Sequence, residues 1–135
     1  MSSNPSLYIE NEELASIIKN KALVSQKDYI IFDVRDDDFE GGNIPGAYNL
    51  PSRLLSDKLF DLVKVHQDCP LVIFHCALSQ VRGPKAARLY KEARSLCGIN
   101  TSQRVSVLRG GFAAWQAKYR DDPLLVENFD IDFWS

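Results

Sequence analysis

A cysteine and an arginine enclose a short loop whose composition suits chemistry on an anion. Cys76 and Arg82 span seven residues, between a short apolar run and a segment that Pro84 opens with helical periodicity. Backbone N–H groups of such a loop can converge on an oxyanion, helped by the positive end of the following helix. The same donors favour a cysteine thiolate, and an arginine offers a planar fork to two oxygens of a tetrahedral anion. We therefore predict that Cys76 is a nucleophile and that Arg82 clamps the oxyanion.

The backbone amides between these two residues are predicted to bind the substrate. They belong to Ala77, Leu78, Ser79, Gln80, Val81 and Arg82 itself. The Ser79 hydroxyl is also expected within reach of the sulfur or of a leaving oxygen. Since most lone cysteines are packing residues, the alternative is a buried Cys76 beside a surface arginine, but the whole arrangement favours function. His75 ends the preceding apolar run, so we expect it to turn inward and form structural hydrogen bonds rather than act as a general base.

Short apolar runs mark the strands that must position this loop. Buried strands are predicted at 29–32, 71–74 and 105–108, with a weaker strand at 47–50 and an edge piece at 7–9. Between them, segments of helical periodicity start at Asn11, which we expect to cap its helix, at Ser52, at Pro84 and after Gly110-Gly111. The alternation of strand and helix predicts an α/β fold, a parallel sheet with helices on both faces. Ligands of such folds lie beyond the carboxyl ends of the strands, where the Cys76 loop belongs.

Composition narrows the classes of protein that this chain can be. A length of 135 residues predicts one domain over 1–135, and the apolar tail 121–135 is expected to pack on it, with partner binding as the alternative. A net charge of −2 argues against nucleic-acid binding, and no apolar run is long enough to cross a membrane. The start has no signal sequence, and three cysteines without paired spacing imply no disulfide framework. We therefore predict a cytoplasmic protein, with the nucleus as a second compartment.

Several motifs together resemble a known family. Besides the Cys76–Arg82 loop they are Asp33-Val34-Arg35, the run from Gly42 to Ala47, and the run from Leu108 to Trp115. They resemble the rhodanese-fold dual-specificity phosphatases of the cell-division-cycle, mitosis-inducing class, and their small single-domain fungal and plant relatives. The resemblance implies a five-stranded, mostly parallel sheet and a protein tyrosine or dual-specificity phosphatase that works through a phosphocysteine, without a cofactor. It also implies a phosphorylated protein or a small oxyanion as substrate, and suggests a role in the cell cycle.

Other activities stay open beside this one. Some of the small relatives reduce arsenate, and the same cysteine could do so with glutathione or glutaredoxin as the external thiol. Sulfurtransferases of the rhodanese fold have a loop one residue shorter, which makes sulfur transfer the less favoured reading. A non-catalytic phosphate-binding module is the third alternative, and the presence of both Cys76 and Arg82 argues against it.

The chain departs from the family pattern at the general acid. The mitosis-inducing phosphatases carry glutamates in the loop, where this sequence has Ala77 and Val81. A general acid could instead come from the three aspartates at 36–38 or from Glu40. The favoured interpretation of these residues, however, is an acidic turn exposed to solvent. Without an acid, aryl phosphates should react better than alkyl phosphates, because a phenolate leaves more easily.

The remaining motif residues are interpreted as structural or electrostatic. Asp33 and Arg35 match the family's structural pair. Some relatives carry a cysteine that protects the nucleophile by forming a disulfide with it, and this chain has Val34 at that position. Cys69 cannot take its place, because about 23 Å of extended strand separates it from Cys76, too far for a disulfide. No metal site is predicted. The plant relatives bind zinc through Cys and His residues of their tail, and the segment after Trp115 has neither residue type. Cys97 is assigned to the core. Basic residues that could steer anions are Lys85, Arg88 and Arg109, of which Arg109 is expected to lie nearest the site.

Overall fold

Five parallel strands form one sheet in the computed structural model, which describes residues 7–36 and 41–134. The strands are β1 (Tyr8–Ile9), β2 (Ile30–Asp33), β3 (Tyr48–Asn49), β4 (Leu71–His75) and β5 (Arg104–Leu108). Their order across the sheet is β1-β5-β4-β2-β3, and every neighbouring pair runs parallel. The predicted α/β class and five-stranded sheet are confirmed. The sheet is wholly parallel where the sequence predicted a mostly parallel one.

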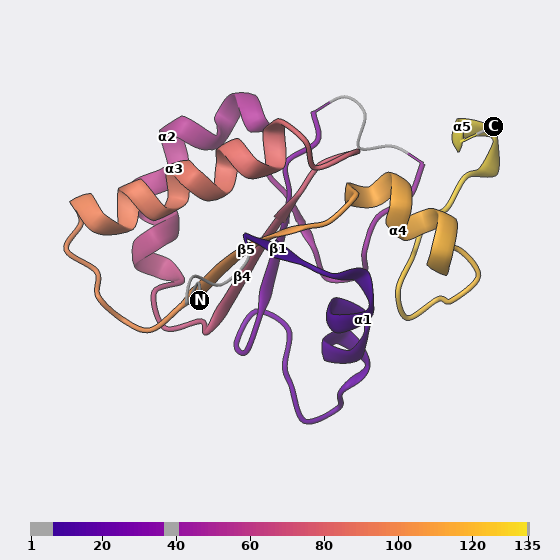
Figure 1. Ribbon diagram of the computed structural model, residues 1–135, viewed down its shortest axis with the longest axis horizontal. Coiled ribbons are helices and arrows are strands. Elements are labelled where there is room, and N and C mark those ends of the chain that lie inside the picture. The colour runs from indigo at the N-terminus through magenta and orange to yellow at the C-terminus, as the bar shows by residue number, and fades with distance from the viewer. Residues whose placement is uncertain (1–6, 37–40, 135) are drawn as a thin grey trace, which may run out of the picture.

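Helices cover both faces of this sheet. They are α1 (Asn11–Lys19), α2 (Ser52–Val65), α3 (Arg82–Leu96), α4 (Gly111–Tyr119) and the short α5 (Ile131–Trp134). Figure 1 shows α2 and α3 packed side by side on one face, and α1 and α4 on the other. Parallel strands buried on both sides read as continuous apolar runs, because each face of the strand meets a helix layer.

Alternate residues of the central strands feed two separate cores. Phe32 and Phe74 pack at 5.4 Å between ring centroids in the core beneath α2 and α3, together with Tyr90 of α3. Ile31 and Ile73 face the opposite way, into the core beneath α1 and α4. The alternation continues at the end of β4. His75, its last residue, and Cys76, which follows it, therefore turn to opposite sides of the sheet.

Two helix starts differ from the sequence prediction. Asn11 does not cap α1. It is the first helical residue, and its side-chain amide donates to the carbonyl of Arg109 at 2.9 Å. Helix α3 begins at Arg82, two residues before Pro84, because a proline within the first turn removes no intrahelical hydrogen bond. The predicted end of α3 is confirmed: Gly98 follows it with a φ of +70°.

The last residues of the chain run back over the α1 and α4 side. Leu125 and Val126 are buried there, and Asn43 and Glu127 exchange two backbone hydrogen bonds of 2.9 Å. The Trp134 indole in α5 donates to the carbonyl of Gly41 at 2.9 Å. The sequence analysis did not predict the helix α5.

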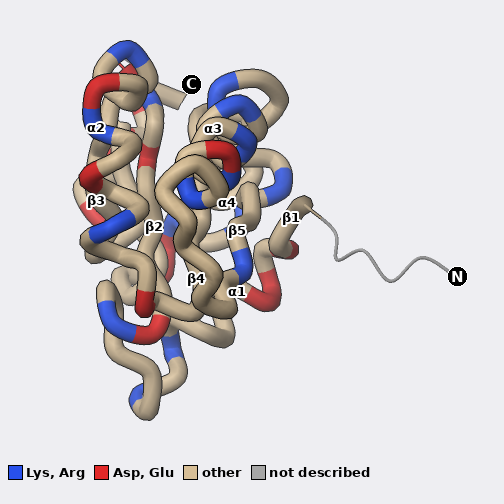
Figure 2. Tube along the Cα trace, turned by 90° about the vertical axis from the view of Figure 1, so that its left-hand side faces the viewer, with Lys and Arg blue, Asp and Glu red and all other residues tan. Residues whose placement is uncertain are grey.

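Charge is mixed along α2. Basic and acidic residues alternate along α2, as Figure 2 shows, so this helix presents no face of a single sign. In the described ranges, 7–36 and 41–134, no helix combines the length and the apolar character that a membrane span requires.

Candidate active site

The Cys76 loop encloses a small cavity beyond the carboxyl end of β4. The cavity has a volume of about 170 Å³ and is lined by Cys76, Ala77, Leu78, Gln80, Val81 and Arg82. Cys76 is only 2% exposed, so its side chain lies at the bottom of this cavity, on the α2 and α3 side of the sheet. The structure thus brings together all of the predicted loop residues except Ser79, which does not line the cavity.

The side chain of Ser79 is directed into the protein, away from the cavity. The backbone of Ser79 has a φ of +56°, the left-handed region, and its side chain is buried. The Ser79 amide donates to the sulfur of Cys76 at 3.1 Å, and its hydroxyl accepts from the Cys76 amide at 3.4 Å. The hydroxyl is therefore directed at the main chain rather than at a leaving oxygen, while the amide is one of the donors that favour a thiolate.

Helix α4 determines the orientation of the first loop peptides. The amide of Phe112 donates to the Cys76 carbonyl at 2.9 Å, and the amide of Ala113 donates to the Ala77 carbonyl at 2.8 Å. In a planar trans peptide the N–H points opposite to the carbonyl. The amides of Ala77 and Leu78 therefore point away from α4, as a cradle for an anion requires.

A glycine permits this close approach. Gly111 has a φ of +62°, and a Cβ atom built on it would lie 2.5 Å from both the Cys76 and the Ala77 carbonyl oxygens. No larger residue could occupy this position without displacing the loop. The sequence analysis quoted Gly111 as part of a motif but did not find this role.

Arg82 reaches from the start of α3 toward an aspartate that follows β2. Its Nη1 lies 3.5 Å from Oδ2 of Asp36, which also accepts from the Ser52 hydroxyl at 2.6 Å. Burial alone would raise the pKa of Asp36, but the Ser52 hydroxyl, the Arg53 amide and the charge of Arg82 together hold this pKa below its usual value. A low pKa keeps Asp36 ionised, which is unfavourable for a general acid. The other acids considered, at 37–38 and 40, lie outside the described residues.

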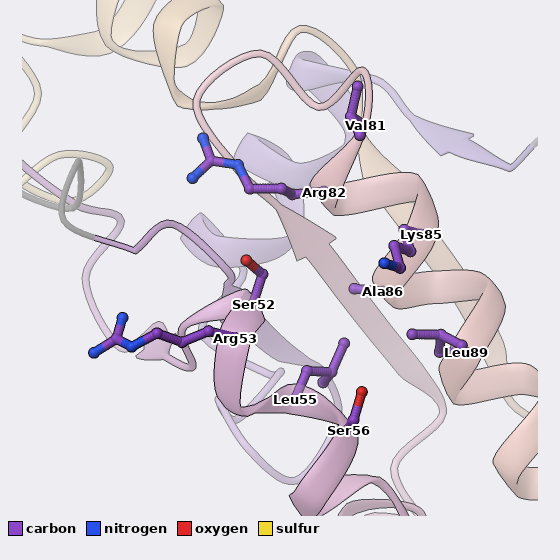
Figure 3. A pocket seen from close by; sticks show the side chains of 9 residues that line it. All are labelled: Ser52, Arg53, Leu55, Ser56, Val81, Arg82, Lys85, Ala86 and Leu89. Carbon is purple, nitrogen blue, oxygen red and sulfur yellow. The ribbon is translucent and has the colours of Figure 1, made fainter.

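A second cavity of about 290 Å³ adjoins the first between α2 and α3. It shares Val81 and Arg82 with the Cys76 cavity and is also lined by Arg53 and Lys85. Figure 3 shows the Arg82 and Arg53 side chains extending toward the same side of this cavity, from opposite helices. Lys85 is thus near the site, whereas Arg88 is exposed on α3 and does not line either cavity.

Arg109 does not lie where the sequence analysis expected it. It follows β5 as predicted, but its Nε donates to Glu10 at 2.8 Å and its guanidinium stacks 4.5 Å over the ring of Tyr8. These contacts direct the side chain toward β1, because a carboxylate and an aromatic face are both available there.

A buried ion pair supports the loop from the opposite side of the sheet. Asp33 and Arg35 are fully buried, with Nη2 of Arg35 2.6 Å from Oδ2 of Asp33 and 2.8 Å from the Gly42 carbonyl. His75 is fully buried 3.7 Å from the same carboxylate, and burial lowers its pKa. The Phe112 ring contacts both the Arg35 guanidinium, at 4.5 Å, and the His75 ring, at 6.2 Å. This packing confirms that His75 turns inward, and it places Asp33 and Arg35 in the core, where their interpretation as fold-stabilising residues stays a prediction.

The three cysteines are all free thiols, and Cys76 is the one that lines the cavity at the end of β4. Burial raises the pKa of Cys69, whose sulfur donates to the Leu71 carbonyl at 3.4 Å. Cys97 caps the end of α3. Within the described part of the chain, no cluster of His, Cys, Asp or Glu side chains is arranged to hold a metal ion.

Fold and loop together define a class: a parallel α/β protein that holds a buried cysteine at the bottom of a loop beyond the carboxyl end of a central strand. The model of the rhodanese-like domain matches residues 11–118, and the chain belongs to this family.

The proteins similar to this chain are named either for phosphatase activity or for arsenic resistance. The dual specificity phosphatase ibp1 of Schizosaccharomyces pombe is 36% identical over 129 residues, which cover 82% of this chain and 91% of that protein. Arsenical-resistance protein 2 of Saccharomyces cerevisiae is 30% identical over 125 residues, covering 87% and 93%. Among solved structures, Ygr203w, a yeast protein tyrosine phosphatase of the rhodanese family, superposes with a TM-score of 0.82 at 28% identity, covering 98% of this chain and all of that one.

Proposed function

We propose that this protein is a cysteine-dependent phosphatase of the tyrosine or dual-specificity type. The observation that carries the proposal is the seven-residue loop, in which the buried Cys76 sulfur accepts a hydrogen bond from the Ser79 amide at 3.1 Å and lines the same cavity as Arg82. Phosphatase names among relatives that align along most of the chain support the same activity.

The proposed reaction has two displacements at phosphorus. The Cys76 thiolate attacks, an S–P bond forms and the ester P–O bond breaks, while the loop amides and Arg82 bind the equatorial oxygens. Water then attacks the phosphocysteine, the S–P bond breaks, and inorganic phosphate leaves with the thiolate regenerated. Residues 76–82 include no carboxylic acid, so the leaving oxygen takes its proton from water, which favours aryl over alkyl esters.

Arsenate reduction is the second candidate, because relatives of both kinds align with nearly the whole chain. Here the thiolate forms an S–As bond and displaces hydroxide from arsenate. An external thiol such as glutathione then attacks the Cys76 sulfur, so that the S–As electron pair reduces arsenic to arsenite and a mixed disulfide forms. A second thiol, from glutathione or glutaredoxin, releases Cys76.

Three assays on one preparation test these proposals: hydrolysis of p-nitrophenyl phosphate, reduction of arsenate with glutathione and glutaredoxin, and sulfur transfer from thiosulfate to cyanide. We expect p-nitrophenyl phosphate hydrolysis that Cys76→Ser abolishes, and Cys97→Ser is the matched control that should retain it. Reduction without hydrolysis would replace the phosphatase by the second candidate. If no activity depends on Cys76, the enzymatic proposal is wrong, and phosphate binding alone would indicate a binding module.

A further inference from the structure

We propose that Asp36 is a positioning residue that holds the Arg82 guanidinium in place for oxyanion binding, an inference that rests on the proposed function. Asp36 follows β2, on the edge of the sheet where the Cys76 loop lies. Its side chain is about one quarter exposed, at 26%, and that of Arg82 is similar at 31%. Arg82 lines the Cys76 cavity, so Asp36 contacts a residue of the cavity wall.

The Asp36 carboxylate joins three elements that are distant in sequence. Oδ2 accepts from the Ser52 hydroxyl at 2.6 Å and lies 3.5 Å from Nη1 of Arg82. Oδ1 accepts from the backbone amide of Arg53 at 3.3 Å and from its guanidinium at 3.4 Å. The first turn of α2 thus orients the carboxylate, and the carboxylate in turn contacts the first residue of α3.

This arrangement restrains a long side chain. A guanidinium carries five N–H donors in a rigid planar fork, so an acceptor that holds one of its nitrogens also limits the direction of the whole fork. Without an anchor, the guanidinium would lose rotamer freedom only when substrate binds, and this loss would oppose binding and catalysis. Figure 3 shows Ser52 and Arg82 facing one another across the second cavity, the geometry that a bridging carboxylate requires.

Two other roles for Asp36 make different predictions. A general acid would matter more for a poor leaving group than for a good one, because a basic oxygen needs its proton in the transition state. A carboxylate that merely competed with the substrate for Arg82 would inhibit, and its removal would increase activity. A positioning residue acts on the phosphoryl group alone, so its loss should reduce activity equally for all leaving groups.

The experiment measures kcat/KM for p-nitrophenyl phosphate and phenyl phosphate with wild-type protein and Asp36→Asn. We expect the substitution to reduce both values by the same factor, about 10- to 100-fold. Ser52→Ala, which removes only the hydroxyl that orients the carboxylate, should reduce both by a smaller common factor. Asp61→Asn, at an exposed position of α2, is the matched control and should have no effect.

A double-mutant cycle separates positioning from general damage to the fold. If Asp36 acts through Arg82, Asp36→Asn should reduce activity by less than threefold in the Arg82→Lys background. Independent losses would overturn the proposal, as would a larger loss on phenyl phosphate, no loss, or a gain.

Phosphate binding provides a readout that does not need turnover. Inorganic phosphate should protect Cys76 from iodoacetamide, and we expect Asp36→Asn to raise the half-protecting concentration about tenfold or more. If wild-type protein hydrolyses neither ester, the phosphatase proposal fails, and the Asp36 proposal is judged by this protection alone. Unchanged protection in Asp36→Asn would overturn it.

Discussion

Gly111 and Gly98 have similar backbone conformations in very different surroundings. Their φ angles are +62° and +70°, both in the left-handed region that favours glycine. A Cβ atom on Gly98 would have no heavy atom within 4 Å, whereas one on Gly111 would meet the carbonyl oxygens of Cys76 and Ala77 at 2.5 Å. The same substitution can therefore test conformational strain at one site and contact with the catalytic loop at the other.

We expect Gly98→Ala to lower the free energy of unfolding by about 1–2 kcal/mol, the penalty for an L-residue in the left-handed region, and to leave activity unchanged. Gly111→Ala should lose at least as much stability and about 100-fold in kcat/KM, because the loop must move. Urea denaturation and p-nitrophenyl phosphate hydrolysis measure the two effects. Wild-type activity in Gly111→Ala would contradict the role assigned to α4.

The residues of the site differ in how far the sequence predicted them. Cys76 and Arg82 were predicted because their spacing encodes a loop of defined size, and this local pattern needs no knowledge of the fold. The pairing of Arg82 with Asp36 was not predicted, because it depends on where β2, α2 and α3 meet in space. Arg109 was expected near the site on position alone, but Glu10 and Tyr8 attract its side chain toward β1.

At the scale of elements, two adjacent leucines of the segment after α4, Leu124 and Leu125, differ in burial, and only Leu125 packs in the core. Leu125 is fully buried in the core beneath α1 and α4, while Leu124 is 62% exposed. The indole of Trp115, itself fully buried in α4, donates to the Leu125 carbonyl at 2.8 Å. Helix α4 therefore contacts the Cys76 loop at its start and the C-terminal segment along its length.

Leu125→Ala should lower the free energy of unfolding by about 2–5 kcal/mol, because it leaves a cavity in a closed core. Leu124→Ala should change it by no more than about 0.5 kcal/mol, as is usual for surface positions. Thermal and urea denaturation of the two variants provide the comparison. Equal effects would mean that the segment does not pack on α4 as described.

Strand positions were predicted better than helix ends. Apolar runs bounded by polar residues located all five strands to within a few residues. The signal was strongest for β2, β4 and β5, which are almost wholly buried, because a strand buried on both faces is apolar throughout. Asn11 was expected to cap α1, yet its side chain donates to Arg109, a partner 98 positions away that no local pattern reveals. Helix α5 was missed for a similar reason, since Trp134 is held by Gly41 from a distant loop.

At the scale of the whole molecule, both histidines resist protonation in the folded state. Burial lowers the pKa of His75 and of His66 from the ordinary value of 6.5, and these are the two histidines of the chain. The unfolded chain therefore binds more protons below pH 6.5, and stability must fall as pH decreases through that range. Carboxylates whose pKa is lowered in the folded state, such as Asp36, stabilise the fold while they are ionised. This stabilisation is lost only at lower pH, below their ordinary pKa of 3.8.

We expect the free energy of unfolding to be nearly constant between about pH 7 and pH 8 and to decrease below pH 6.5. Because burial raises the pKa of Cys69 above its ordinary value of 9.0, stability should also decrease at alkaline pH. Each histidine contributes a slope of at most about 1.4 kcal/mol per pH unit. His66→Gln should remove one of the two contributions and leave the other, which makes it the variant of choice for urea titrations between pH 5 and 7. A stability that rises on acidification through this range would contradict the burial of His75.

The two hydrogen bonds from α4 to the Cys76 loop bear on any attempt to transplant the loop. Residues 75–84 look like a self-contained segment in the sequence, but the carbonyls of Cys76 and Ala77 accept hydrogen bonds from the amides of Phe112 and Ala113. A recipient scaffold with a matching strand and helix, but without the Gly111 helix start, would leave those carbonyls to water and the peptide planes free to rotate. Engineering this chemistry into another parallel sheet therefore means moving two segments together.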